Sequence, residues 1–236
     1  MAAELKAIGF DADDTLWQNE AFFRVTQERF ASLLADFVEP DHLQERLNAA
    51  EQRNLGRYGF GIKGFTLSMI ETAIEVTGEK VSGAVIRELI EAGQDMLAHP
   101  VQLLPGVAET IQTLAEHYEL VLITKGDLLD QERKLAQSGL GDLFDGVEIV
   151  SDKTSATYRH AFARHGSGAE AAMMVGNSLK SDVIPALEAG AWGVYVPHDL
   201  TWGYEHAPEP ESHPRFARIQ TLDALPDLID RLESKR

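Results

Sequence analysis

The sequence predicts an α/β protein in which a parallel sheet lies between two layers of helices, with a helical subdomain inserted early in the chain. Five short, nearly continuous aliphatic runs are typical of strands that are covered on both faces. Helical patterns separate the later runs, and this alternation favours parallel strands joined by right-handed crossovers. About 80 residues separate the first strand from the next helix of this series, which is far more than a strand–helix–strand unit needs. The extra length predicts the insertion.

The expected elements alternate along the chain after the insertion. Strands are expected at residues 5–10, 120–124, 146–151, 172–176 and 193–197. Helices are expected at residues 107–117, 128–138, 155–164, 181–189 and 222–232. Residues 197–215 contain four prolines and are expected to form a surface loop.

The insertion is expected to form a helical subdomain of residues 17–100, and residues 1–16 and 101–236 are expected to form the α/β core. Apolar side chains recur at helical spacing in the inserted stretch, for example within residues 67–74. Pro100 marks the return of the chain to the core.

Composition narrows the range of partners. The 236 residues carry a net charge of −17, so a nucleic-acid polymer, which requires a basic surface, is not an expected partner. Any anionic substrate needs a local cluster of Lys or Arg in this negative field. The absence of cysteine excludes disulfides, thiolate catalysis and zinc–thiolate sites. No secretion-signal pattern and no apolar run of membrane-spanning length is seen, so no membrane partner is expected and the cytoplasm is the expected location.

The most informative motif is Asp11-Ala12-Asp13-Asp14-Thr15, which follows the first expected strand. Side chains two residues apart in extended backbone point the same way, so Asp11 and Asp13 are expected to reach one site at the carboxyl end of the sheet. Two neighbouring carboxylates repel each other, and a hard divalent cation would stabilise them. The alternative is an Asp-rich turn in which Asp14 or Thr15 caps the next helix.

The ends of the second and third strands carry polar residues suited to binding phosphate. The second strand ends in Thr124-Lys125-Gly126, where a hydroxyl and backbone N–H groups at a glycine turn can bind phosphoryl oxygens. Lys153 follows the third strand and can neutralise developing phosphoryl charge. Each residue also has an ordinary explanation, since Thr124 can cap the following helix and Lys153 can be a solvated loop residue.

The fourth strand runs into the segment Gly176–Asp182. Asn177 and Asp182 lie where the strand meets the next helix, and their side-chain oxygens can ligate Mg²⁺. Helix capping by Asn177, Ser178 or Ser181 is the alternative, because Asn and Ser are favoured caps. Four strand ends that present Asp/Asp, Thr, Lys and Asn/Asp in this order indicate a common site more strongly than any one motif does.

As an ordered set, these motifs resemble those of the haloacid dehalogenase-like hydrolase superfamily. The matching motifs are Asp11-x-Asp13-x-Thr15, Thr124, Lys153 and Gly176-Asn177-x4-Asp182. The resemblance spans residues 5 to about 197 and implies a Rossmann-like core of three layers, α/β/α. The inserted helices resemble the cap of the phosphatase branch.

The resemblance implies a role for each matching residue. Asp11 would be the nucleophile that forms an aspartyl-phosphate, and Asp13 would be the general acid and base. Thr124 would hold a phosphoryl oxygen, and Lys153 would screen the charge between the nucleophile and the phosphate. The other core residues expected to bind phosphate are Thr15, Lys125 and Gly126.

The magnesium site implied by the resemblance includes the Asp11 carboxylate and the Asp13 backbone carbonyl, completed or supported by Asn177 and Asp182. The superfamily usually has an acidic residue at the position of Asn177. An amide oxygen still binds a hard cation, but the site then has one negative charge fewer. We therefore expect a functional site that binds magnesium more weakly than one with an acidic residue at the position of Asn177, with Asp182 contributing more to magnesium binding.

The resemblance implies a magnesium-dependent phosphatase that acts on a small phosphate monoester. Dehalogenases of the superfamily generally lack an Asp at the position of Asp13 and need no metal. A phosphomutase would use the same residues, and cleavage of a carbon–phosphorus bond would need a Schiff-base lysine, for which Lys63 is the clear candidate in the cap. Two non-enzymatic alternatives are a phospho-accepting switch domain, disfavoured by the chain length and the insertion, and a ligand-binding member without catalysis, disfavoured by the intact motifs.

The residues that select the substrate are the least determined. Trp17, Asn19 and Glu20 directly follow the Asp motif and are candidates for the hinge or wall of the leaving-group pocket. Arg57 and Lys63 lie in a basic, glycine-rich segment that would close over the site and exclude water. The alternative for this segment is a solvent-exposed turn between two helices.

Overall fold

The computed structural model describes residues 4–200 and 202–234, and the chain divides into two compact units. The α/β unit comprises Met1–Glu20, Val101–Lys125 and Gln131–Arg236, and the helical unit comprises Ala21–Pro100 with Gly126–Asp130. The expected core and loop ranges include residues 1–3, 201 and 235–236, which lie outside the described residues. Within the described ranges, no helix is both long enough and apolar enough to cross a membrane.

The α/β unit contains, in its described part, a six-stranded parallel sheet with the order β3-β2-β1-β4-β5-β6. The strands are β1 (Ala7–Phe10), β2 (Glu119–Lys125), β3 (Gly146–Val150), β4 (Ala172–Gly176), β5 (Trp192–Tyr195) and β6 (Phe216–Arg218). The predicted parallel α/β fold and its five strands are confirmed. The sequence analysis missed β6 because this edge strand has three residues and no buried side chain, so it leaves no hydrophobic run.

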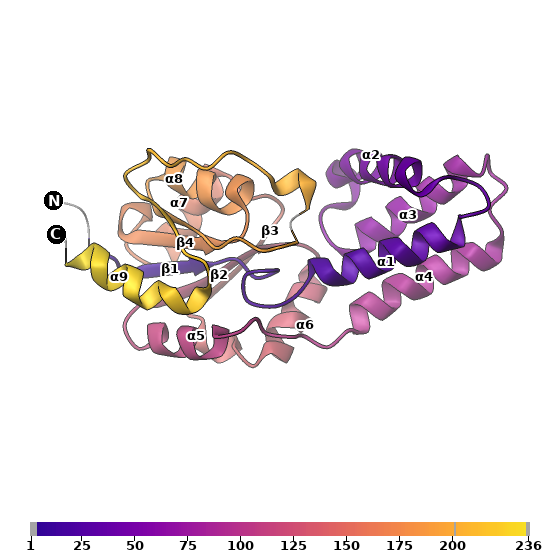
Figure 1. Cartoon of the computed structure of the whole chain (residues 1–236). Coiled ribbons are helices and arrows are strands. Elements are labelled where there is room, and N and C mark those ends of the chain that lie inside the picture. The colour runs from indigo at the N-terminus through magenta and orange to yellow at the C-terminus, as the bar shows by residue number, and fades with distance from the viewer. Residues whose placement is uncertain (1–3, 201, 235–236) are drawn as a thin grey trace. The chain divides into compact units, whose positions relative to one another are not determined.

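The two faces of the sheet carry separate cores because side chains alternate along each strand. On β1, Ile8 and Phe10 pack into the core formed with α5 (Val107–Ala115) and α9 (Leu225–Glu233). Ala7 belongs to the opposite core, which α7 (Ser155–Arg164) and α8 (Ile184–Ala189) cover. Figure 1 shows these two pairs of helices on opposite sides of the sheet. Burial on both faces explains the nearly continuous aliphatic strands.

The crossover helices agree with the predicted ranges, with one informative difference. α6 occupies Leu128–Ser138 and α7 begins after a capping box in which Thr154 Oγ1 accepts the N–H of Thr157 at 3.2 Å. The helix expected from residue 181 begins earlier, because a π-helical turn, η3 (Leu179–Val183), precedes α8. Such turns widen the helix and often occur at functional sites.

The helical unit contains α1 (Glu20–Leu33, whose first residue belongs to the α/β unit), α2 (Pro40–Tyr58), α3 (Ile62–Val76) and α4 (Gly83–Ala98). Their apolar faces share one core, which includes Phe30, Leu47 and Met69. Proline at the start of α2 and the Ser82 side chain at the start of α4 fix two of the helix ends.

Candidate active site

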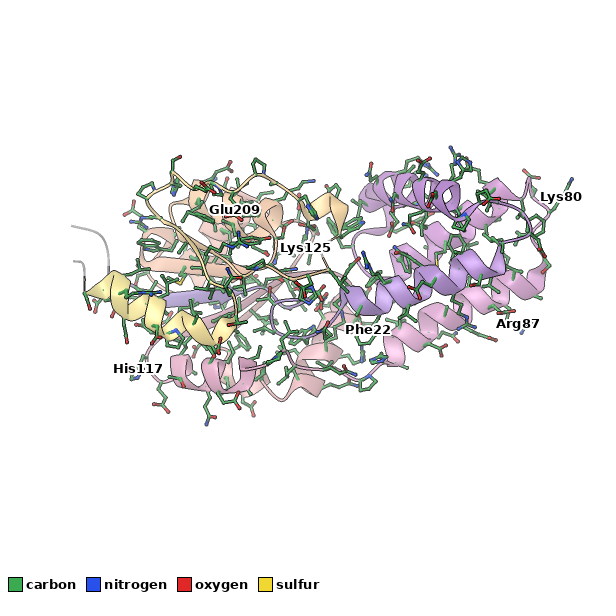
Figure 2. All side chains as sticks on the ribbon, viewed as in Figure 1. Phe22, Lys80, Arg87, His117, Lys125 and Glu209 are labelled. Atoms are coloured by element: carbon green, nitrogen blue, oxygen red, sulfur yellow. The ribbon has the colours of Figure 1, made fainter. Side chains whose placement is uncertain are left out.

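The residues singled out in the sequence gather at the carboxyl ends of three neighbouring strands. Asp11 directly follows β1, Thr124 and Lys125 end β2, and Asn177 directly follows β4. These ends are adjacent because β1 pairs with both β2 and β4. Figure 2 labels Lys125 at this end of the sheet. Open parallel sheets bind their ligands at this edge.

Asp11 lies in a buried cluster with Lys153 and Asp182. The Lys153 ammonium pairs with the Asp11 carboxylate and also donates to Asp182 Oδ1 at 2.7 Å. The side chain of Lys153 is 1% exposed and that of Asp11 is 10% exposed. Buried charges require partners, and here one ammonium serves two carboxylates. When both carboxylates are ionised, the cluster has an excess of negative charge, which favours a further cation.

Burial controls the protonation of this cluster. It raises the pKa of Asp11 to about 7, against the opposing charge of Lys153 and with a further rise from Asp182. Burial alone would lower the pKa of Lys153, but the two carboxylates raise it well above its usual range, so the lysine remains protonated. A cation bound to Asp11 would favour its carboxylate form, which is the form a nucleophile needs.

Thr15 connects the segment after β1 to the segment after β4. Its Oγ1 lies 3.0 Å from Asp11 Oδ2 and 3.3 Å from Asn177 Oδ1, and it accepts the Asn177 backbone N–H at 3.1 Å. One hydroxyl proton can serve only one of the two oxygens at a time. The Asp11 carboxylate and the Asn177 amide oxygen therefore lie close together, next to the same hydroxyl. Thr15 is only 2% exposed.

The π-helical turn η3 holds Asp182 against the end of β4. Asp182 Oδ2 accepts the Ser178 backbone N–H at 2.9 Å, while Oδ1 accepts from Lys153. A Cβ atom on Gly176 would lie 2.3 Å from Asp182 Oδ2, so only glycine permits this approach. Both Asp182 oxygens thus accept hydrogen bonds within the cluster, and this carboxylate supports the site through them.

The donors available for a metal ion are mixed in type. In the part of the chain that the structure describes, no group of three or more His, Cys, Asp or Glu side chains has an arrangement that could hold a metal ion. Oxygens of Asp11 and Asn177 are brought together by Thr15. One carboxylate, one amide and a backbone carbonyl are ligand types that Mg²⁺ accepts. The donor set therefore fits Mg²⁺, with fewer charged ligands than an all-carboxylate site.

Asp13 has its own set of partners, which the sequence analysis missed. Its Oδ1 accepts from Trp17 Nε1 at 2.7 Å, and its Oδ2 accepts from Gln131 Nε2 at 2.8 Å. The Lys134 ammonium lies 3.0 Å and 3.2 Å from the two oxygens and also donates to Asn19 Oδ1 at 2.9 Å. Gln131 and Lys134 are three residues apart on the predicted helix at 128–138, a spacing that places side chains on one helix face. This spacing is the sequence pattern from which the two partners of Asp13 could have been predicted.

Asp14 has the capping role that was the alternative interpretation of the motif. It adopts a left-handed backbone (φ 60°) and its carboxylate accepts the backbone N–H groups of Asn19 and Glu20 at the start of α1. Burial raises the pKa of Asp14 to about 6, against these hydrogen bonds. The motif therefore contains a cap as well as the two residues of the candidate site.

Lys125 is engaged by a residue from the later loop. Its ammonium lies 2.8 Å from Glu205 Oε1 and 2.8 Å from Ser181 Oγ. Glu205 also accepts from Ser178 Oγ at 2.6 Å and from the Ser181 hydroxyl. The expectation of a plain surface loop is thus wrong at Glu205, whose side chain is 14% exposed and ties the loop to η3. Thr124, beside Lys125, is 1% exposed, and its hydroxyl donates to the Lys125 carbonyl at 3.2 Å.

Three residues expected to contact the substrate belong to the helical unit as divided above. Arg57 lies in the last turn of α2, and Lys63 lies in the first turn of α3 and pairs with Asp127 at 2.9 Å. Gly126 begins the short segment Gly126–Asp130 of the same unit. Within the segment at 53–63, residues 53–58 end α2, residues 59–61 form the turn, and residues 62–63 begin α3. The role of Arg57, Lys63 and Gly126 in substrate binding stays a prediction.

The arrangement as a whole is suited to covalent catalysis followed by proton transfer. A buried carboxylate at a strand end is oriented by Lys153 and Thr15 and can attack an electrophile. A second, more open carboxylate on Asp13 can exchange protons with a leaving group or water. Lysine and hydroxyl groups around the first carboxylate can stabilise an anionic transition state.

Known proteins resemble this chain in sequence and fold. A family model for haloacid dehalogenase-like hydrolases matches residues 5–190. Two curated relatives are named glyceraldehyde 3-phosphate phosphatase. The one from Methanothermobacter thermautotrophicus is 29% identical over 209 residues, covering 84% of this chain and 88% of its own length. The one from Methanocaldococcus jannaschii is 25% identical over 242 aligned residues, covering 96% of each chain.

The crystal structure of a haloacid dehalogenase-like family hydrolase from Xanthomonas campestris has a similar fold, with a TM-score of 0.88. It is 38% identical in sequence, and the match covers 99% of this chain and 98% of that chain.

Proposed function

Because the chain belongs to the haloacid dehalogenase-like hydrolase family, we propose that it is a magnesium-dependent phosphatase of a small phosphate monoester, acting through an aspartyl-phosphate. The observation that carries the proposal is the pair of carboxylates at the end of β1, one buried beside Lys153 and the other more open. Displacement of a halide needs no proton donor for the leaving group, whereas release of an alcohol from phosphate does. The second carboxylate therefore favours phosphate ester hydrolysis.

The reaction proceeds in two steps. A carboxylate oxygen of Asp11 attacks phosphorus, the ester P–O bond breaks, and Asp13 gives its proton to the departing alkoxide. Water then attacks the phosphorus of the aspartyl-phosphate, Asp13 takes a proton from that water, and inorganic phosphate leaves. Asp11 returns to a carboxylate and Asp13 to its protonated form, so the cycle closes.

The surrounding residues stabilise the charge that develops on the phosphoryl group. Lys153 lies against Asp11 and can neutralise a phosphoryl oxygen, and the Thr124 hydroxyl stands at the end of the neighbouring strand. Mg²⁺, when bound, would neutralise charge shared between the nucleophile and the phosphate. Asp11, Asn177 and the Asp13 backbone carbonyl would hold it.

The relatives suggest the class of substrate. Both curated relatives carry the name of a phosphatase for glyceraldehyde 3-phosphate, which is a short alkyl phosphate with a primary alcohol as its leaving group. We take this triose phosphate as the first substrate to test. Its alkoxide is a poor leaving group, and this matches the presence of Asp13 as a proton donor.

The experiment measures phosphate release from glyceraldehyde 3-phosphate and from p-nitrophenyl phosphate, with and without Mg²⁺. Wild-type protein is compared with Asp11→Asn and with a matched control, Asp142→Asn, at an exposed position. We expect release that requires both Mg²⁺ and Asp11 and that is unchanged in the control. Release that persists in Asp11→Asn, or no release from either ester, would contradict the proposal.

A further inference from the structure

The carboxylate of Asp13 is held by side chains whose roles in the reaction are unassigned. We propose that Gln131 and Lys134 of α6 are positioning residues that hold Asp13 in place for proton transfer. This inference rests on the proposed function and adds two residues to it. It concerns only residues of the α/β unit, where Asp13, Gln131 and Lys134 all lie.

The contacts fix both oxygens of the carboxylate. Oδ1 accepts from Trp17 Nε1 and from Lys134 Nζ, at 2.7 Å and 3.0 Å. Oδ2 accepts from Gln131 Nε2 and from Lys134 Nζ, at 2.8 Å and 3.2 Å. A carboxylate that accepts hydrogen bonds from three side chains cannot rotate without breaking several of them. The contacts therefore hold one orientation of Asp13.

Gln131 is oriented by its acceptors. Its Nε2 donates to Asp13 Oδ2 at 2.8 Å and to the Lys125 carbonyl at 3.1 Å, so its two N–H groups each have an acceptor. Its Oε1 is buried and has no hydrogen-bond partner. An unsatisfied buried oxygen is unfavourable, so an apolar side chain would suit this position better if packing alone mattered. The donated hydrogen bonds account for an amide at this position.

Lys134 connects Asp13 to the chain that follows the motif. The lysine side chain is 9% exposed, and its ammonium bonds both Asp13 and Asn19. Asp13 itself is 23% exposed, more than Asp11, so it has more freedom to move without such contacts. A proton donor must lie within hydrogen-bond reach of the leaving oxygen, and a small displacement of a catalytic group is costly. Gln131 and Lys134 can therefore raise the reaction rate by fixing Asp13, without touching the substrate.

The test uses the dependence of the reaction on its leaving group. The kcat/KM value includes steps only through the first irreversible one, which is departure of the alcohol. An alkoxide needs the proton of Asp13, whereas p-nitrophenolate leaves without it. We expect Lys134→Met and Gln131→Met to lower kcat/KM for glyceraldehyde 3-phosphate by about tenfold or more. The value for p-nitrophenyl phosphate should change little, and Lys6→Met, an exposed matched control, should change neither.

A double mutant tests whether Lys134 acts through Asp13. Asp13→Asn should lower the ratio of kcat/KM for glyceraldehyde 3-phosphate to kcat/KM for p-nitrophenyl phosphate by about 10²–10⁴-fold. Asp13→Asn/Lys134→Met should lower this ratio no further. Thermal unfolding shows whether each variant folds. If Lys134→Met does not fold, the result for Gln131→Met tests the positioning inference.

The outcomes separate this inference from the proposed function. If Asp13→Asn lowers the ratio but neither Lys134→Met nor Gln131→Met does, the positioning inference fails and the phosphatase proposal stands. If Asp13→Asn leaves the ratio unchanged, or wild type releases no phosphate from either ester, the proposed function fails and this inference fails with it. A wild type that cleaves only the aryl ester overturns the inference, because Asp13 then protonates no alkoxide.

Discussion

Asp11 and Asp13 are separated by one residue, yet each pairs with a lysine in a different environment. The Asp11 side chain is 10% exposed, and its partner Lys153 is 1% exposed and shared with Asp182. The Asp13 side chain is 23% exposed, and its partner Lys134 is 9% exposed and also donates to Asn19. The comparison shows how one short motif supplies two carboxylates for different tasks. The more buried one shares its lysine with a second carboxylate, and the more exposed one is held by a lysine together with the neutral donors Trp17 and Gln131.

The largest expected effect comes from removing the buried lysine. Lys153→Met leaves Asp11 and Asp182 buried without their shared cation, so we expect a loss of about 3–5 kcal/mol in the free energy of unfolding. Lys134→Met should cost about 1–2 kcal/mol, because Asp13 is nearer to solvent and retains Trp17 and Gln131 as partners. Urea unfolding of both variants and of wild type measures the difference. Equal losses would show that the Asp11–Lys153 and Asp13–Lys134 pairs contribute equally to stability, which would contradict the difference argued above.

A smaller effect should follow from restoring charge on the Asp11 side. Asn177→Asp adds a carboxylate beside the Thr15 hydroxyl, which also contacts Asp11. We expect the Mg²⁺ concentration needed for half-maximal phosphatase activity to fall by about tenfold, because a charged oxygen binds a hard cation more tightly than an amide. Asn48→Asp, on an exposed face of α2, serves as the matched control. An unchanged Mg²⁺ requirement in Asn177→Asp would remove Asn177 from the proposed ligand set.

The smallest effect concerns Glu205 in the later loop, which pairs with Lys125. Burial would raise the pKa of Glu205, but Lys125 and the hydroxyls of Ser178 and Ser181 outweigh it and hold that pKa below its ordinary value of 4.5. A lowered pKa means that the ionised carboxylate stabilises the fold above about pH 4.5, and that this stability is lost as the pH falls through the lowered pKa. Glu205→Gln should therefore cost about 1 kcal/mol at neutral pH.

The pH dependence of Glu205→Gln supplies the control. The difference in free energy of unfolding between wild type and Glu205→Gln should shrink as the pH falls below 4.5, because Glu205 of wild type then takes up its proton. A difference that stays constant across this range would mean that the charge of Glu205 contributes nothing and that only its shape matters.

Residues at strand ends could be predicted from the sequence, whereas residues on helix faces could not. Asp11, Thr124, Lys153 and Asn177 follow or end hydrophobic runs, and parallel strands bring such ends together. Lys134 lies within a correctly predicted helix, but the helix pattern does not say which polar side chain is buried or which carboxylate it meets.

Glu205 and the turn η3 illustrate a second limit. Residues 197–215 read as a polar, proline-rich loop, and the sequence contains no pattern that joins Glu205 to Lys125 across 80 positions. The contact exists because β2 and the turn after β4 lie near each other in the folded unit. At η3 the Ser178 hydroxyl accepts the Ser181 N–H and Asp182 accepts the Ser178 N–H, and propensity alone reveals neither contact.

The central claim is that Asp11 becomes covalently phosphorylated while Asp13 moves protons. The direct measurement is an acid quench of Asp13→Asn during turnover of radiolabelled p-nitrophenyl phosphate, followed by peptide mapping. The account predicts label on Asp11, because the aryl group leaves without a proton while hydrolysis of the aspartyl-phosphate is slowed. Labelled inorganic phosphate released by this variant with no label on the peptide, or label that persists in Asp11→Asn/Asp13→Asn, would contradict the account.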